Sequence, residues 1–311
     1  MAVVVVGSLI TDIISYVERL PQPGETIRGK SLFIGCGGKG ANQCVAAAKL
    51  GAECTMIGKL GPVNDPLSRI HIEALTKNGV QRRLFHSSQD QTGSAIIMVD
   101  KDAANAMTSV LGANADLKPD EIDSVAESIQ GADVLVAALG IPLKSTIVAL
   151  KKGRKHGSWY LKIIFNAAPA ASNLPSEVYQ LSSVFCVNES EAEMLTGEKV
   201  DSIESADRSA QILQERGCKV VLITLGSRGA YLKDEANNGI LIAAPPVKAV
   251  DTTGAGDSFI GALAYYMAYY PKLPLQTMVE RSCQVAAFSV QKPGTQISFP
   301  TKEELPEELF L

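Results

Sequence analysis

The chain has 311 residues, of which 46% are hydrophobic and 20% charged, and its formal net charge at pH 7 is −4. A chain of this length buries a sizeable core, and α/β domains of this size often remain single, so we expect one domain over residues 1–311. The acidic balance argues against a nucleic-acid partner, which requires a basic surface, and the lack of an apolar run long enough to cross a bilayer argues against a membrane partner.

Short β-branched runs alternate with helical stretches along the chain. In chain order, strands are expected at residues 3–6, 55–57, 134–137, 163–165, 184–187 and 220–225. Helices are expected at residues 67–77, 119–130, 145–156, 206–217, 256–270 and 275–290. This alternation predicts an α/β fold with a largely parallel central sheet, helices on both faces, and ligands near the carboxyl ends of the strands.

Two regions interrupt the alternation. Residues 13–34 contain strand-like pieces and turns but no helix, and residues 84–110 do the same around 94–99. We expect both regions to form a small β-sheet lid at the edge of the main sheet. An exposed sheet edge invites pairing with another copy of the chain.

A glycine-rich segment, Gly35-Cys-Gly-Gly-Lys-Gly-Ala-Asn-Gln43, precedes a helix of small residues at 44–51. Its glycines let the backbone approach a polar ligand closely, while Lys39 and Asn42 supply a charge and an amide. The segment matches the dinucleotide fingerprint G-x-G-x-x-G, but Glu53 comes too early for the acid that this fingerprint requires. The alternative is a tight turn feeding a helix that packs closely on a sheet.

A second glycine-rich segment, Asp251-Thr-Thr-Gly-Ala-Gly-Asp-Ser-Phe259, follows residues 248–250, which resemble the end of a strand. Gly254, Ala255 and Gly256 then form the first turn of an apolar helix, where backbone N–H groups have no helical carbonyl to bond. Those donors and the positive end of the helix dipole form a pocket for anionic oxygens.

Asp257 is unexpected beside an anion pocket, because a carboxylate repels the anion. The arrangement makes chemical sense if Asp257 takes a proton from a hydroxyl while the N–H groups hold charge that develops on a phosphoryl group. The alternative is a glycine-rich turn in which Asp257 is an ordinary helix-start residue.

Five segments together carry a family resemblance. They are Gly37-Gly-Lys-Gly-Ala-Asn42, Asn166-Ala-Ala-Pro-Ala170, Asn188-Glu-Ser-Glu-Ala-Glu193, Thr224-Leu-Gly-Ser-Arg-Gly229 and Asp251-Thr-Thr-Gly-Ala-Gly-Asp257. In this order they resemble the signatures of the ribokinase family of carbohydrate kinases, and the resemblance spans nearly the whole chain.

The resemblance implies transfer of a phosphoryl group from ATP to a sugar hydroxyl, with D-ribose giving ribose 5-phosphate, and it implies Mg²⁺ and K⁺ as cofactors. The residues that it assigns to the sugar are Asp12, Gly38, Lys39, Gly40, Asn42 and Asp257. Those that it assigns to the nucleotide are Asn188, Thr224, Gly226, Ser227, Gly229 and Gly256. It puts Glu191 near magnesium and assigns to potassium Asp251, Thr253, Ser289, Lys292, Gly294 and Ser298. Family members often form homodimers through the lid.

The sequence departs from the family pattern at four places, one of which is Ile10, where some relatives have a polar side chain. Gly140 stands where ribokinases usually have a glutamate, residues 61–66 distort a glycine–acid–glycine turn, and Cys283 replaces a polar residue near the adenine. A kinase for another furanose or a nucleoside, and a binding protein without catalysis, are therefore alternatives. A nicotinamide oxidoreductase is disfavoured because the acid-bearing second strand is missing.

The six cysteines are scattered, without a C-x-x-C pair, and several lie in apolar runs. Such cysteines are typical of reduced core thiols, which indicates a reducing cytoplasm. The apolar residues 1–10 lack a basic leader and a cleavage site, so we expect a buried strand there rather than a signal peptide.

Overall fold

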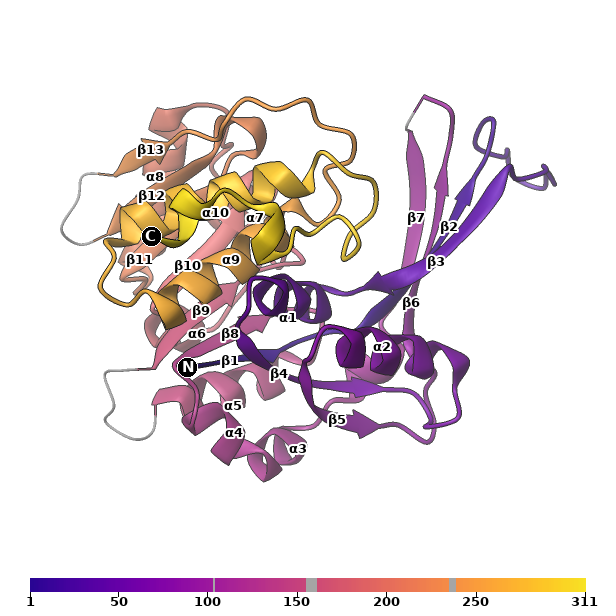
Figure 1. Ribbon diagram of the computed structural model, residues 1–311, viewed down its shortest axis with the longest axis horizontal. Helices are drawn as coiled ribbons and strands as arrows, with labels where there is room; N and C mark the ends of the chain where they lie inside the picture. Colours follow the sequence, from indigo (N-terminus) through magenta and orange to yellow (C-terminus); the bar gives the residue numbers. More distant parts are fainter. Residues whose placement is uncertain (103, 155–160, 235–238) are drawn as a thin grey trace.

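The computed structural model describes residues 1–102, 104–154, 161–234 and 239–311. The β-structure consists of two sheets. A nine-stranded sheet is covered by helices on both faces, and a four-stranded sheet projects from one end of the main body (Figure 1). This is the predicted α/β architecture.

The nine-stranded sheet has the order β13-β12-β11-β10-β9-β8-β1-β4-β5. Its strands are β1 (Ala2–Val6), β4 (Glu53–Leu60), β5 (Gln81–His86), β8 (Val134–Ala138), β9 (Lys162–Asn166), β10 (Val184–Asn188), β11 (Val220–Thr224), β12 (Ala230–Asp234) and β13 (Ile240–Ile242). All neighbours from β11 to β5 pair in parallel, whereas β12 and β13 are antiparallel additions at one edge. The sheet is therefore largely parallel, as predicted.

Side chains that alternate along each strand divide the core into two layers. In β1, Val3 and Val5 face one layer and Val4 and Val6 face the other. The first layer is built with α1 (Lys39–Lys49), α9 (Ala255–Tyr269) and α10 (Leu275–Ser289). The second is built with α3 (Pro119–Ser124), α4 (Ala126–Gln130), α5 (Leu143–Arg154), α6 (Ser176–Leu181), α7 (Glu189–Thr196) and α8 (Ile203–Glu215).

The remaining helix, α2 (Pro66–Lys77), lies beside β5. The 3₁₀ turns are η1 (Gly112–Asp116), η2 (Gly226–Arg228), η3 (Lys302–Glu304) and η4 (Glu307–Phe310).

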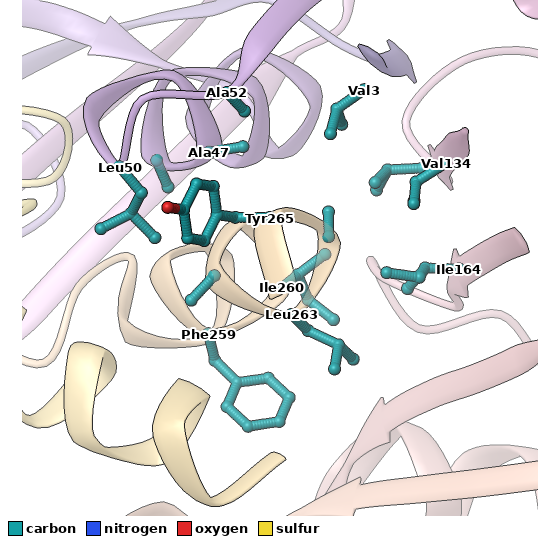
Figure 2. Packing of buried hydrophobic residues seen from close by; sticks show 14 of the residues in the cluster. Val3, Ala47, Leu50, Ala52, Val134, Ile164, Phe259, Ile260, Leu263 and Tyr265 are labelled. Atoms are coloured by element: carbon teal, nitrogen blue, oxygen red, sulfur yellow. The ribbon is translucent and has the colours of Figure 1, made fainter. Parts of the chain in front are cut away.

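Helix α9 is buried along almost its whole length. Figure 2 shows Ile260 and Leu263 directed toward the strands that carry Val134 and Ile164, while Tyr265 packs beside Leu50 at the end of α1. A helix that is apolar on every side belongs in the interior, so the buried body of α9 from Asp257 onward packs between α1, α10 and the sheet.

The small sheet has the order β3-β2-β6-β7 and comprises β2 (Ile10–Tyr16), β3 (Ser31–Gly37), β6 (Gly93–Val99) and β7 (Asn105–Val110). The two expected lid regions thus supply its strands, but residues 84–86 do not belong to it. They form the end of β5, where His86 pairs with Leu60 of β4 in the main sheet.

Most other elements differ from those expected by a few residues at their ends, and three differences have a clear local cause. α1 begins at Lys39, five residues before the expected start, because Gly38, with a φ of +86°, makes the turn between the strand that ends at Gly37 and the helix. The expected helix at 119–130 is divided at Val125, whose φ of −114° is not helical. Residues 248–250 form no strand, since Val250 N–H bonds to the carbonyl of Val290 beyond α10 and not to a strand. The last two residues of the expected helix at 145–156 lie outside the described residues.

Candidate active site

Polar side chains gather at the carboxyl edge of the main sheet. Ser8 follows β1, and Asn166, Asn188 and Thr224 are the last residues of β9, β10 and β11. In parallel α/β sheets this edge is where ligands bind. The glycine-rich starts of α1 and α9 meet at the same edge, because the two helices pack against each other.

The start of α1 lies directly on the connection between β1 and β2. Gly38 has a left-handed φ of +86°, and a Cβ placed on it would lie 2.5 Å from Ile10 N. The backbone N–H of Ala41 donates to the carbonyl of Ser8 at 3.1 Å. Glycine is thus required at 38 by the fold itself, and Lys39 and Gly40 form the first turn of α1 beside Ser8.

Asp257 is buried at 7% exposure in the first turn of α9 and is held by two side chains of α1. Its Oδ2 accepts a hydrogen bond from Asn42 Nδ2 at 2.8 Å, and its Oδ1 accepts one from Gln43 Nε2 at 2.9 Å. Gln43 Nε2 also donates to Asn166 Oδ1 at 3.0 Å. Hydrogen bonds to both carboxylate oxygens fix the plane of the group, as a positioned base requires.

Some of the backbone N–H groups at the start of α9 have no hydrogen-bond acceptor within the described residues. The N–H of Ala255 is engaged with the carbonyl of Thr252 at 3.2 Å. Within the described residues, the N–H groups of Gly254, Gly256 and Asp257 donate to no protein acceptor. No atom lies within 4 Å of a Cβ placed on Gly256, so this turn borders open space. Three of the N–H groups can therefore receive an anionic oxygen.

Asp12 brings a second carboxyl group to the site from β2 of the small sheet. A Cβ placed on Gly37 would lie 2.2 Å from Asp12 Oδ2, which puts the carboxylate against the loop that leads into α1. Burial and the negative charge of Asp257 raise the pKa of Asp12 from its usual 3.8 to about 6. Two carboxyl groups therefore face the same small volume, a pattern typical of functional sites.

A cavity of about 480 Å³ lies beside the start of α9. Most of the residues expected at the nucleotide line it: Thr224, Gly226, Ser227, Gly229 and Gly256. Cys283 and the apolar side chains of Val247, Phe259 and Val290 complete the wall. An apolar slot that ends on backbone donors is suited to a flat ring that carries phosphates.

Asn188 and Glu191 do not line this cavity; they form the start of α7. Asn188 Oδ1 accepts from the N–H of Glu191 at 2.8 Å, and Glu191 Oε2 accepts from the N–H of Asn188 at 2.9 Å. Burial raises the pKa of Glu191, and the charge of Asp257 raises it further, while Lys39 and the Asn188 hydrogen bond lower it. Glu191 Oε1 accepts no hydrogen bond from the described residues, so one oxygen remains for water or a cation.

Five of the six residues expected at potassium lie in two adjoining loops, and the sixth, Ser289, is the last residue of α10. Asp251 accepts from the N–H of Thr253 and from that of Gly294, both at 2.9 Å. The Lys292 side chain turns away to pair with Glu304 at 2.6 Å. The hydroxyls of Ser289 and Ser298 donate to the carbonyls of Ala286 and Thr295.

Backbone carbonyls are the better candidates for cation ligands in these loops. Within the described residues, the carbonyl oxygens of Asp251, Thr253 and Gly294 accept no hydrogen bond. The described parts of the chain contain no group of three or more His, Cys, Asp and Glu side chains that could hold a metal ion. A carbonyl-lined site suits a hard monovalent cation better than a transition metal.

Gly140 has a φ of +100°, and a Cβ placed on it would lie 3.0 Å from Ser8 Oγ. A glutamate at this position would be strained in the present backbone. Introducing a glutamate therefore requires a change of backbone and would not simply add a sugar contact.

Two side chains in the site were not identified from the sequence. Gln43 is the last residue of the glycine-rich segment, but its type and position alone gave it no role. Gln296, whose Nε2 donates to Asn42 Oδ1 at 3.0 Å, lies 254 positions away along the chain, and no pattern connected them.

No helix among the described residues is long and apolar enough to cross a membrane.

The chain is similar to known proteins along almost its whole length. The family model described as pfkB family carbohydrate kinase matches residues 2–302. The chain is 47% identical to ribokinase of Mus musculus, with 99% of this chain and 95% of the relative covered. It is 35% identical to deoxyribokinase of Salmonella typhi, with 100% and 99% covered. A solved structure of Arabidopsis thaliana ribokinase complexed with ribose and ATP superposes with a TM-score of 0.91 at 30% identity, covering 99% of this chain and 98% of that one.

Proposed function

We propose that D-ribose is the substrate of this chain, which belongs to the pfkB family of carbohydrate kinases. The reaction is transfer of the γ-phosphoryl group of ATP to the 5-hydroxyl of ribose, which gives ribose 5-phosphate and ADP. One observation carries the proposal: a buried carboxylate, Asp257, is fixed by two amides beside backbone donors that open onto a nucleotide-sized cavity.

Asp257 acts as the general base. As the sugar oxygen attacks the γ-phosphorus, its proton passes to the Asp257 carboxylate and the bond to the β–γ bridging oxygen breaks. The N–H groups of Gly254, Gly256 and Asp257 donate hydrogen bonds to the phosphoryl oxygens and so stabilise the negative charge that develops on them. Catalysis then depends mainly on positioning and on electrostatic stabilisation, as is usual in phosphoryl transfer.

The sugar lies between the small sheet and the start of α1. Asp12 accepts hydrogen bonds from sugar hydroxyls, and the turn at Gly38, Lys39 and Gly40 forms the floor. The amide of Asn42 already bonds to Asp257 and Gln296. Asn42 therefore contributes to the site by holding the carboxylate of Asp257 in place. The 35% identity to a deoxyribokinase makes 2-deoxyribose the second sugar to test.

Magnesium and potassium complete the proposed site. The unused Oε1 of Glu191 would hold magnesium through water, and the ion would neutralise phosphate charge when it enters with ATP. The unbonded carbonyls of Asp251, Thr253 and Gly294 would hold potassium. Potassium there would order the loop before α9, and thus the backbone donors of its first turn.

We also propose that two copies pair through the small sheet. Its register puts Ile34, Ile13 and Ile96 side by side on one face, and Leu32 and Val110 lie on the same face. Leu32, Ile34, Ile96 and Val110 are each at least 47% exposed. An apolar face of this kind is suited to a second copy.

A cytoplasmic location is part of the proposal. All six cysteines are free thiols and five of them are buried, as expected in a reducing compartment.

The direct test is a phosphorylation screen of ribose, deoxyribose, fructose and adenosine with ATP and magnesium. We expect ribose to give the highest kcat/KM. Preference for another acceptor would assign the chain to that substrate, and ligand binding without turnover of any acceptor would favour a non-catalytic homologue.

A further inference from the structure

A chain of buried side-chain amides reaches Asp257 from a distant loop. Gln296 Nε2 donates to Asn42 Oδ1 at 3.0 Å, and Asn42 Nδ2 donates to Asp257 Oδ2 at 2.8 Å. The three residues are 8%, 5% and 7% exposed, respectively. The Gln296 amide donates to the Asn42 amide, which in turn donates to the carboxylate, so the first hydrogen bond polarises the second.

The other carboxylate oxygen is held from the opposite side by Gln43. This side chain is fully buried, and its Nε2 donates both to Asp257 Oδ1 at 2.9 Å and to Asn166 Oδ1 at 3.0 Å. Its Oε1 is buried without a hydrogen-bond partner. A buried amide oxygen without a hydrogen bond lowers the stability of the folded protein. The Gln43 amide is nevertheless oriented so that its nitrogen donates to the carboxylate while its own oxygen has no partner.

The loop that carries Gln296 is itself fastened to α1. Lys49 Nζ donates to the backbone carbonyls of Gln296 and Phe299, each at 2.8 Å. α1 therefore contacts the base through Asn42 and Gln43 at its start, and holds the loop of Gln296 at its end. The position of Gln296 relative to Asn42 is fixed by the same helix that supports the base.

We propose that Gln43 and Gln296 are positioning residues for phosphoryl transfer. Together they fix the direction in which the Asp257 carboxylate presents its remaining lone pairs to the sugar hydroxyl, Gln43 directly and Gln296 through Asn42. The inference rests on the proposed function of Asp257 as the base. A carboxylate has about four acceptor sites, so two amide bonds leave room for the substrate.

The expected effects follow from geometry. Losing one hydrogen bond to a charged group, or misplacing a reacting group by about 1 Å, costs roughly ten- to a hundredfold in rate. We expect Gln43→Met to lower kcat by about a hundredfold, because it acts on the base directly. Gln296→Met acts through Asn42, and we expect a loss of about tenfold.

The kinetic test separates positioning from packing. Gln296→Glu keeps the shape of the side chain but cannot donate when ionised, so we expect it to lower kcat as much as Gln296→Met. The matched control is Gln291→Met, because the Gln291 amide also donates at 3.0 Å, but to the carbonyl of Ala287 within α10. In the three site variants, KM for ATP should remain close to that of the control, and kcat is measured at a temperature where all four proteins are folded.

A structural readout does not depend on turnover. In a crystal structure of Gln296→Met, we expect the Asn42 amide to rotate so that its contact with Asp257 Oδ2 is lost. The inference is overturned if that contact persists at 2.8 Å, if kcat of Gln43→Met and Gln296→Met stays within about twofold of the control, or if the losses appear only in KM. If the unmutated protein transfers no phosphoryl group, the proposed function fails, while the Gln296→Met structure still decides whether Gln296 orients Asn42.

Discussion

The carboxyl groups of Asp257 and Asp12 face the same site but are supported in different ways. Asp257 lies on the buried helix α9 and accepts hydrogen bonds from Asn42 and Gln43. Asp12 lies on the small sheet, and its carboxylate accepts no hydrogen bond from the described residues. One acid is fixed within the protein itself, and we propose that the other obtains its partners from the substrate.

This difference assigns separate tasks to the two regions. A group that is positioned in advance lowers the barrier to reaction, because no free energy is spent on orienting it during the reaction. A group without internal partners contributes to binding, since a sugar hydroxyl supplies a donor to a half-buried acceptor that otherwise lacks one. We therefore expect changes at Asp257 to affect kcat and changes at Asp12 to affect sugar affinity.

The largest effect is expected for Asp257→Asn. Asparagine keeps the size of the side chain but cannot accept the proton, so kcat should fall by about 10²- to 10⁴-fold. Calorimetric affinities for ribose and for a non-hydrolysable ATP analogue should change only a few-fold, because the surrounding groups remain. A comparable loss in affinity and in kcat would remove the distinction between the two regions.

A smaller effect is expected for Asp12→Asn. We expect ribose to bind about 10- to 100-fold less tightly, which corresponds to the loss of one hydrogen bond to a charged group, with a smaller change in kcat. The pKa of Asp12 is about 6, so ribose binding to the unmutated protein should also weaken as the pH falls below that value. Calorimetry at pH 5 and pH 8 tests both points, and affinities that are equal at the two values would contradict the role of the charged form.

Part of the structure around Asp257 could be predicted from the sequence. The glycines before Asp257 predicted the helix start, because a helix N-terminus has a local signature. The assignment of Asp257 as the base stays a prediction. The strand at residues 248–250 was wrong, and residues 84–86 were assigned to the wrong sheet, since strand pairing depends on contacts that are distant in sequence. The amide chain through Gln296 was missed for the same reason, because its members lie 215 and 254 positions apart.

A several-fold effect is expected from potassium. If the cation orders the turn before Asp257, activity in potassium salts should exceed activity in choline or Tris salts at matched ionic strength. The cation loop adjoins α9 but not the small sheet, so ribose affinity should be unchanged. Equal rates in the three salts would exclude the cation from the mechanism.

The smallest effect concerns stability. The folded protein disfavours the charged form of Asp12, because its pKa lies at about 6 and not at the usual 3.8. The contribution of Asp12 to stability is therefore greatest below pH 3.8 and is lost as the pH rises through 6. We expect Asp12→Asn to raise the free energy of unfolding at pH 8 by about 1 kcal/mol, after allowance for solvent at this partly exposed group. Denaturant titrations at pH 8 and at the lowest pH where both proteins fold should show the gain only at the higher value.

The most direct measurement is a crystal structure of the protein with ribose and a non-hydrolysable ATP analogue. We expect the 5-hydroxyl oxygen of ribose within about 2.6–3.2 Å of an Asp257 carboxylate oxygen. The γ-phosphoryl group should lie against the backbone N–H groups of Gly254 and Gly256. A sugar whose hydroxyls all lie beyond hydrogen-bond reach of Asp257, with the nucleotide bound in its cavity, would contradict the assignment of the base.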